Sequence, residues 1–136
     1  MPLLIDTHYF LWLVFEDKSL LPKELKIILD FAKKDTVLVS AISIWEIAIL
    51  EKNGRVNLYQ PAHSWAEEAL KTPGLTLAPL TPEILCESVA LPGDIHKDPA
   101  DRMIVATARL MHAKLMTRDK KILEYAEQGY VNCINA

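Results

Sequence analysis

Short apolar runs alternate with longer stretches of helical periodicity along this chain. The runs are "PLLI" (2–5), "TVLV" (36–39), "LTLAPL" (75–80), "KLMT" (114–117) and the weaker "YVNCI" (130–134). Continuous apolar runs of this kind are typical of strands buried on both faces, as in a parallel sheet. Helices are expected at 8–16, 22–34, 41–52, 62–71, 82–90, 99–112 and 119–127. The alternation predicts an α/β fold with a mainly parallel sheet between two layers of helices.

Proline and glycine fall near the limits of the predicted helices. Pro22 and Pro82 suit first helical turns, and the glycines at 54, 74, 93 and 129 follow helices. No internal repeat or low-complexity segment interrupts the pattern. A chain of 136 residues has the size of one domain, so we expect a single domain over 1–136.

Composition narrows the class of protein. Hydrophobic residues make up 51% and charged residues 24%, the balance of an ordinary globular domain. The longest apolar runs, "FLWLVF" and "IWEIAIL", are far shorter than the roughly 20 residues of a membrane span, so no membrane is expected. The start "MPLLIDTHYF" has no basic region before its apolar run, which argues against a secretory signal and predicts the cytoplasm.

Charge and cysteine content limit the chemistry further. A net charge of −3 gives no general attraction to nucleic acid, but it allows an enzyme that gathers acids in one pocket and recruits metal ions there. Cys86 and Cys133 are far apart and lack metal-ligand spacing. Both are interpreted as reduced packing residues.

The segment "SAISIWEIAIL" (40–50) holds a single charge, Glu46. Wound as a helix, the segment has no polar face, which predicts a buried helix. Burial of an unpaired carboxylate costs roughly several kcal/mol of hydration free energy, so Glu46 is expected to have a partner. The alternative is a position at the helix rim, from which the side chain reaches water.

Other acids gather where predicted strands end. Asp6 directly follows the first strand and Asp119 the fourth, while Asp98 and Asp101 open the helix before the fourth strand. With Glu46, these residues map to the carboxyl edge of a parallel sheet, where ligands bind in such folds. Helix capping explains Asp6, Asp98 and Asp119 taken singly. It does not explain Glu46, and Asp101 shares the core-facing side of its helix, so one common pocket is favoured.

Carboxylates gathered in one pocket favour a bound cation. Two of them about 4 Å apart repel by roughly 1 kcal/mol in water and about 4 kcal/mol at an effective dielectric constant of 20. A divalent cation removes this repulsion. Oxygen ligands without a nearby cysteine or paired histidine suit Mg²⁺ or Mn²⁺ and disfavour zinc.

Three separated segments resemble a known family. They are "LLIDTHYFLWL" near the start, "SAISIWEIAILEKNGRV" in the middle and "HKDPADRMIVATARLMHAKLMTRDKKI" near the end. Together they resemble PIN domains, in particular the VapC-type toxins of bacterial toxin–antitoxin pairs. The resemblance implies a PIN-like three-layer α/β/α sandwich with strand order 3-2-1-4-5 and the activity of a metal-dependent ribonuclease.

The resemblance also implies residue roles. By position, the catalytic and metal-binding acids are Asp6, Glu46, Asp101 and Asp119. Asp98 is an auxiliary acid, and Thr7 and Ser40 match small hydroxyl residues of the family pocket, although cap and strand-end roles explain these two equally well. We hypothesise that the acids hold one or two Mg²⁺ (or Mn²⁺) ions, which activate water for in-line attack on RNA and leave a 5′-phosphate and a 3′-hydroxyl.

Partners follow from the same resemblance. Expected partners are the RNA substrate, a cognate antitoxin and a second copy of the chain. The candidate RNA contacts are Lys52, Arg55, Lys97, Arg102 and Arg118, for which a solvated surface is the alternative. The apolar "YFLWLVF" segment and the helix at 41–52 offer a docking surface for the antitoxin, or are simply buried.

Three other functions fit the sequence less well than a ribonuclease. A hydrolase built on Ser40, Ser43 and His96 lacks a nucleophile-elbow motif. A receiver-like signalling domain needs an aspartate after its third strand, which "LTLAPLTPE" does not supply. A PIN-like module that only binds a partner is disfavoured by the intact set of acids.

Overall fold

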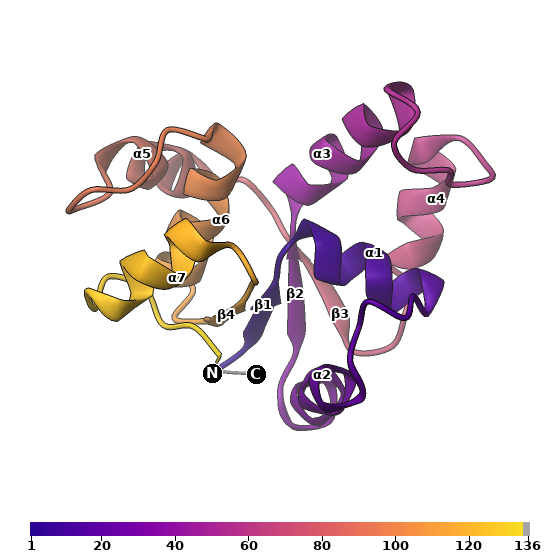
Figure 1. Cartoon of the computed structure of the whole chain (residues 1–136), viewed down its shortest axis with the longest axis horizontal. Coiled ribbons are helices and arrows are strands. Elements are labelled where there is room, and N and C mark those ends of the chain that lie inside the picture. The colour runs from indigo at the N-terminus through magenta and orange to yellow at the C-terminus, as the bar shows by residue number, and fades with distance from the viewer. Residues whose placement is uncertain (135–136) are drawn as a thin grey trace.

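The computed structural model describes residues 1–134, which form a sheet with helices on both sides (Figure 1). The strands are β1 (Leu3–Ile5), β2 (Val37–Ser40), β3 (Leu75–Ala78) and β4 (Lys114–Met116). The helices are α1 (Thr7–Phe15), α2 (Pro22–Lys34), α3 (Ala41–Lys52), α4 (Ala62–Ala69), α5 (Pro82–Ala90), α6 (Pro99–Leu110) and α7 (Lys120–Glu127). The predicted α/β sandwich is confirmed, and element limits differ from the predicted ones by a few residues.

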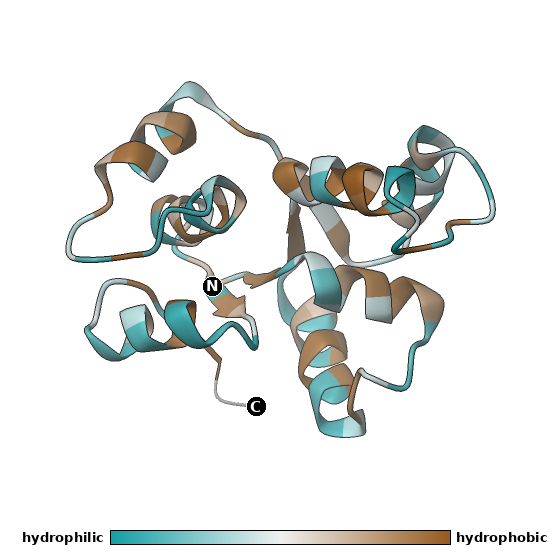
Figure 2. Cartoon of the chain, turned by 45° about the horizontal axis from the view of Figure 1, so that its top comes forward, coloured by the Kyte–Doolittle hydropathy of each residue, from teal (hydrophilic) through white to brown (hydrophobic). Residues whose placement is uncertain are grey.

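All four strands are parallel, in the order β3-β2-β1-β4. Alternate residues of β1 enter different cores: Leu4 packs with α5, α6 and α7, whereas Leu3 and Ile5 pack with α1, α2, α3 and α4. Figure 2 shows the apolar strands between helices that are only partly hydrophobic. Because both faces of the central strands are covered, their sequences are continuously apolar instead of alternating.

Two strand predictions were wrong. The expected fifth strand at 130–134 is reduced, in the part of the chain that the structure describes, to an isolated parallel bridge between Cys133 and Leu115 of β4. Burial on both faces fails for β3, where Thr76 and Leu77 are exposed. β3 lies at the edge of the sheet and pairs with β2 alone, so its outer side is open to solvent.

Two burial predictions were also wrong. Helix α3 is not buried all round, because Trp45 is 58% exposed and Ile49 is 38% exposed. Cys86 is exposed on α5 and is therefore no packing residue, whereas Cys133 is partly buried. Within residues 1–134, no helix has the length and apolar character that a bilayer crossing requires.

The turn into β3 depends on a glycine. Gly74 has φ +87°, and a Cβ at this position would lie 2.6 Å from the Cβ of Ala32 on α2. Its carbonyl accepts a hydrogen bond from the amide of Val37 at the start of β2, at 2.9 Å. Gly54 has a similar φ of +73° but open space around it.

We therefore expect Gly74→Ala to lower the free energy of unfolding by about 2–4 kcal/mol, because backbone strain and a steric clash add. Gly54→Ala, which introduces strain alone, should cost about 1 kcal/mol. Urea unfolding of the two variants measures the difference. Equal losses would contradict the close packing of α2 against this turn.

Candidate active site

A pocket of about 320 Å³ lies at the carboxyl edge of the sheet, where β1 and β4 lead into α1 and α7. Its lining includes every predicted acid, namely Asp6, Glu46, Asp98, Asp101 and Asp119. These residues come from the loop after β1, from α3, from the first turn of α6 and from the loop after β4. The fold thus brings together acids that are far apart in the sequence.

Asp6 is held by two hydrogen bonds at the N-terminus of α1. Oδ1 accepts from the amide of Tyr9 at 3.1 Å, and Oδ2 accepts from the hydroxyl of Thr117 at 2.7 Å. Burial nevertheless raises the pKa of Asp6 above its usual value, against the opposing effect of these bonds. Asp6 is both a helix cap and a pocket residue.

The expected partner of Glu46 is Thr7. The Thr7 hydroxyl donates to Glu46 Oε1 and lies 2.8 Å from the hydroxyl of Ser43 on the same helix as Glu46. Burial raises the pKa of Glu46, and the negative charges of Asp98 and Asp6 raise it further. The carboxylate is therefore oriented from α1 and faces the other acids of the pocket.

Asp98 and Asp101 occupy the start of α6. Asp98 Oδ1 accepts a hydrogen bond from the amide of Asp101 at 3.0 Å, which is the predicted cap. Burial and the charges of the other four acids raise the pKa of Asp101 to about 7. Asp101 is the acid in which the repulsion within the pocket is most evident.

His96, in the loop between α5 and α6, lies beside the acids, whereas the sequence suggests it only as part of the disfavoured hydrolase set. Its Nε2 lies 3.3 Å from Asp101 Oδ2 and 4.0 Å from Asp119 Oδ1. Nε2 is buried and has no partner with hydrogen-bond geometry within residues 1–134. The available signal was the spacing "HKDPAD", which places His96 two residues before the cap of α6.

These residues fit a divalent cation. One ligand atom each from His96, Asp101 and Asp119 lies within 4.8 Å of the others. The raised pKa values of Glu46 and Asp101, to which the charges of neighbouring acids contribute, show negative charge without sufficient compensation. The His96 nitrogen lies beside the expected oxygen donors. Imidazole is tolerated better by Mn²⁺ than by Mg²⁺.

The sequence as a whole matches one family model. The model describes the PIN domain and matches residues 3–128. The chain belongs to the PIN domain family. Ribonuclease VapC22 from Mycobacterium tuberculosis is 34% identical to this PIN domain over 122 residues, which are 88% of each chain. The receiver-like alternative was therefore wrong.

Solved structures share the fold of this PIN domain. VapBC2 from Rickettsia felis, bound to a DNA fragment from its promoter, matches with a TM-score of 0.74 and 16% identity, covering 100% of this chain and 99% of that chain. A toxin–antitoxin complex from Klebsiella pneumoniae matches with a TM-score of 0.63 and 21% identity, covering 89% of this chain and 90% of that chain. At these identities the similarity is one of fold.

The remaining predicted residues are distributed unevenly around the PIN domain. Thr7 lines the pocket, whereas Ser40 is fully buried, caps α3 by accepting from the amide of Ile42 at 3.2 Å, and is not part of the lining. Among the five candidate RNA contacts, Arg118 is the one in the lining. The guanidinium of Arg102 donates to backbone carbonyls, whereas Lys52, Arg55 and Lys97 are exposed outside the lining.

The pKa of Asp101 makes stability depend on pH in the metal-free protein. The folded state binds a proton at Asp101 up to about pH 7, whereas the unfolded state loses it near the ordinary aspartate pKa of 3.8. The free energy of unfolding should therefore fall as the pH rises through this window. Asp101→Asn removes the effect.

We expect Asp101→Asn to be more stable than the parent by about 2 kcal/mol at pH 8 without metal, and to differ little at pH 4. Thermal or urea unfolding in a chelator measures this. Asp30→Asn, at an exposed position on α2, is the matched control; because it keeps Asp101, its stability should show the same pH dependence as that of the parent. A variant less stable than the parent at both pH values would contradict the repulsion.

Proposed function

We propose that this PIN domain is a metal-dependent ribonuclease toxin of the VapC type, which is neutralised by a cognate antitoxin. The single observation that carries the proposal is the convergence of five carboxylates in one pocket at the carboxyl edge of the sheet. The 34% identity with Ribonuclease VapC22 supports the choice of RNA as substrate.

The cofactor is Mg²⁺ or Mn²⁺. Its ligands are proposed to be Asp6, Asp101, Asp119 and Glu46, with Asp98 auxiliary and His96 beside them. When bound, the metal neutralises the scissile phosphate and makes water a stronger nucleophile near neutral pH. The ribonuclease needs no nucleophile from the protein.

The side chains of the protein supply orientation and proton transfer. Thr117 and the amide of Tyr9 fix the carboxylate of Asp6, and Thr7 fixes that of Glu46. Glu46 orients the attacking water and accepts its proton. In-line attack then leaves a 5′-phosphate and a 3′-hydroxyl. The exposed Lys52, Arg55 and Lys97 attract the RNA backbone, while Arg102 is engaged by carbonyls and contributes charge only.

The catalytic assignment predicts that Asp6→Asn and Asp101→Asn each lower RNA cleavage about 100-fold or more, because each removes a charged ligand. Chelation should abolish cleavage by the parent, and Mg²⁺ or Mn²⁺ should restore it. Cleavage of RNA in vitro and growth arrest on expression measure the two effects, with Asp30→Asn as control.

If both variants stay fully toxic and active, the assigned pocket is wrong. Tight association of the parent with antitoxin in the absence of any cleavage would instead support the module that only binds a partner. Product ends that carry a 3′-phosphate would contradict the proposed direction of attack.

The antitoxin is proposed to contact the exposed apolar side chains of α3. Trp45 and Ile49 lie one helical turn apart and are 58% and 38% exposed. An amphipathic partner helix is suited to such a strip. A second copy of the toxin and a cytoplasmic location remain part of the proposal.

We expect Trp45→Ala to weaken the complex with the cognate antitoxin about tenfold or more, since exposed tryptophans often dominate interfaces. Tyr59→Ala is the matched control, because Tyr59 is an exposed aromatic residue outside α3. Isothermal titration calorimetry measures both affinities. An unchanged affinity for the Trp45 variant would place the antitoxin elsewhere.

A further inference from the structure

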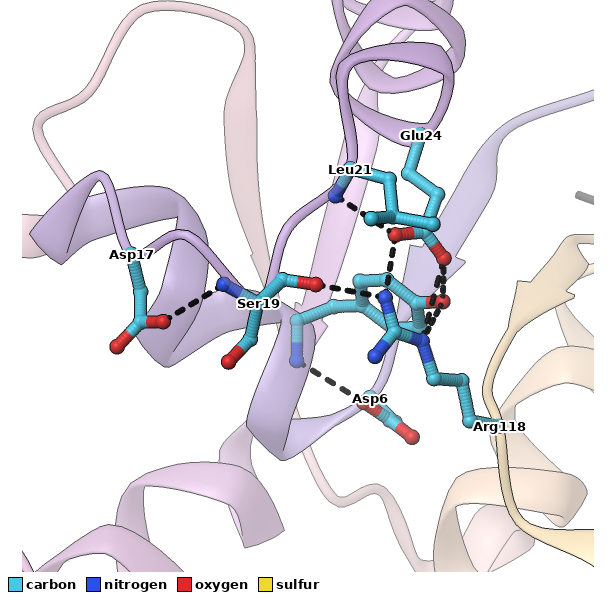
Figure 3. A network of polar contacts seen from close by, with 7 residues as sticks. Asp6, Asp17, Ser19, Leu21, Glu24 and Arg118 are labelled. Atoms are coloured by element: carbon cyan, nitrogen blue, oxygen red, sulfur yellow. Dashed lines mark hydrogen bonds and ion pairs between the residues drawn. The ribbon is translucent and has the colours of Figure 1, made fainter.

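Arg118 lines the pocket from the loop after β4, and its guanidinium is held on several sides (Figure 3). Nε lies 3.0 Å from the Tyr9 hydroxyl and 3.3 Å from Glu24 Oε2. Nη2 donates to the Ser19 carbonyl at 2.7 Å and to Glu24 Oε1 at 2.5 Å. The guanidinium carbon lies 4.6 Å from the centre of the Trp12 ring, a cation–π distance. These contacts fix the orientation of a long side chain.

Glu24 anchors this arrangement from α2. The residue is only 2% exposed, and its Oε1 also accepts from the amide of Leu21 at 2.9 Å. Burial alone would raise the pKa of Glu24, but hydrogen bonds from Arg118, Tyr9 and the Leu21 amide hold it below its usual value. A buried, ionised carboxylate requires a fixed cation, and Arg118 is that cation.

One nitrogen of Arg118 remains unused. Nη1 donates no hydrogen bond within residues 1–134, and it carries no dashed line in Figure 3. The side chain is 44% exposed despite its anchors. Arg102 differs, because all three of its guanidinium nitrogens donate to carbonyls. Arg118 therefore keeps donors for a group that enters the pocket.

We propose that Arg118 is a preformed phosphate-binding residue for single-stranded RNA, and that Glu24 positions it. The inference rests on the proposed ribonuclease function. Arg118 would bind the RNA phosphate that neighbours the scissile phosphate. Among the described residues that line the pocket, Arg118 is the only lysine or arginine. A polyanion that approaches five carboxylates needs such a cation outside the metal site.

The fixed orientation accounts for the choice of residue. An arginine presents planar donors that match phosphate oxygens, and a guanidinium already held by Glu24 loses little conformational entropy on binding. The same donors would accept an acidic side chain of a protein partner. The pocket location beside the catalytic acids favours RNA, and the protein partner is an outcome of the test.

The test replaces the ion pair as a unit, with Glu24→Met and Arg118→Met combined, because removal of Arg118 alone leaves a buried carboxylate unpaired. Binding of fluorescein-labelled, mixed-sequence single-stranded RNA is measured by anisotropy in Mg²⁺, in an Asp6→Asn background that prevents cleavage. We expect affinity to fall about tenfold or more, and the slope of log K against log salt to decrease by about 0.7. When the same double substitution is made in the chain that retains Asp6, KM for RNA cleavage should rise by a similar factor, while kcat stays within about threefold of the parent value.

Glu24→Gln tests the positioning role separately. The variant keeps Arg118 but weakens its anchor, so KM should rise by a smaller factor with kcat unchanged. Should the double variant not fold, Arg118→Lys decides, because it keeps the positive charge and loses the planar donors. RNA affinity equal to that of the parent would then overturn the proposal.

The matched control is Glu87→Met with Arg109→Met. This pair joins Arg109 Nε to Glu87 Oε2 at 3.0 Å, is partly buried on both sides, and lies outside the pocket lining. RNA affinity should stay unchanged. A fall in kcat without loss of RNA affinity in the Glu24/Arg118 variant, or loss of antitoxin binding alone, overturns the proposal. A parent that neither cleaves nor binds RNA would refute the ribonuclease function itself.

Discussion

Repulsion among carboxylates is the physical constraint on which this site depends. Five acids line one pocket; burial raises the pKa values of Asp6, Glu46 and Asp101, and the charges of neighbouring acids raise those of Glu46 and Asp101 further. The hydrophobic layers on both faces of the sheet hold these groups together at a cost in stability. A trade-off between folding stability and activity is common at sites whose ligands are preorganised in the absence of the cation.

Helix capping and pocket formation are compatible in this PIN domain. Asp6, Asp98 and Asp119 each accept a hydrogen bond from the backbone at the start of a helix, and each also lines the pocket. The parallel sheet explains the coincidence, since α1 and α7 follow strands and α6 leads back to the start of β4, so that all three helices begin at the carboxyl edge. The positive ends of these helices partly offset the negative charge of the acids.

Contacts between distant segments fix the side chains of the site. Thr7 on α1 orients Glu46 on α3, and Thr117 after β4 orients Asp6 after β1. Glu24 on α2 in turn holds Arg118, so a helix that contributes nothing to the acidic pocket is connected to its rim. The geometry of the site therefore depends on several elements of the fold at once, and a change in α2 is expected to affect the pocket.

The sequence by itself determined the strands β1, β2 and β4, the acids near their ends, and Glu46 as the single charge in an apolar helical segment. These features depend on local periodicity and on neighbours in the chain. Only the tertiary structure revealed His96 beside Asp101, the exposure of Trp45 and the ion pair of Arg118 with Glu24. The partners in that ion pair are 94 residues apart. Such pairings depend on how helices pack over the sheet, which hydrophobic periodicity does not specify.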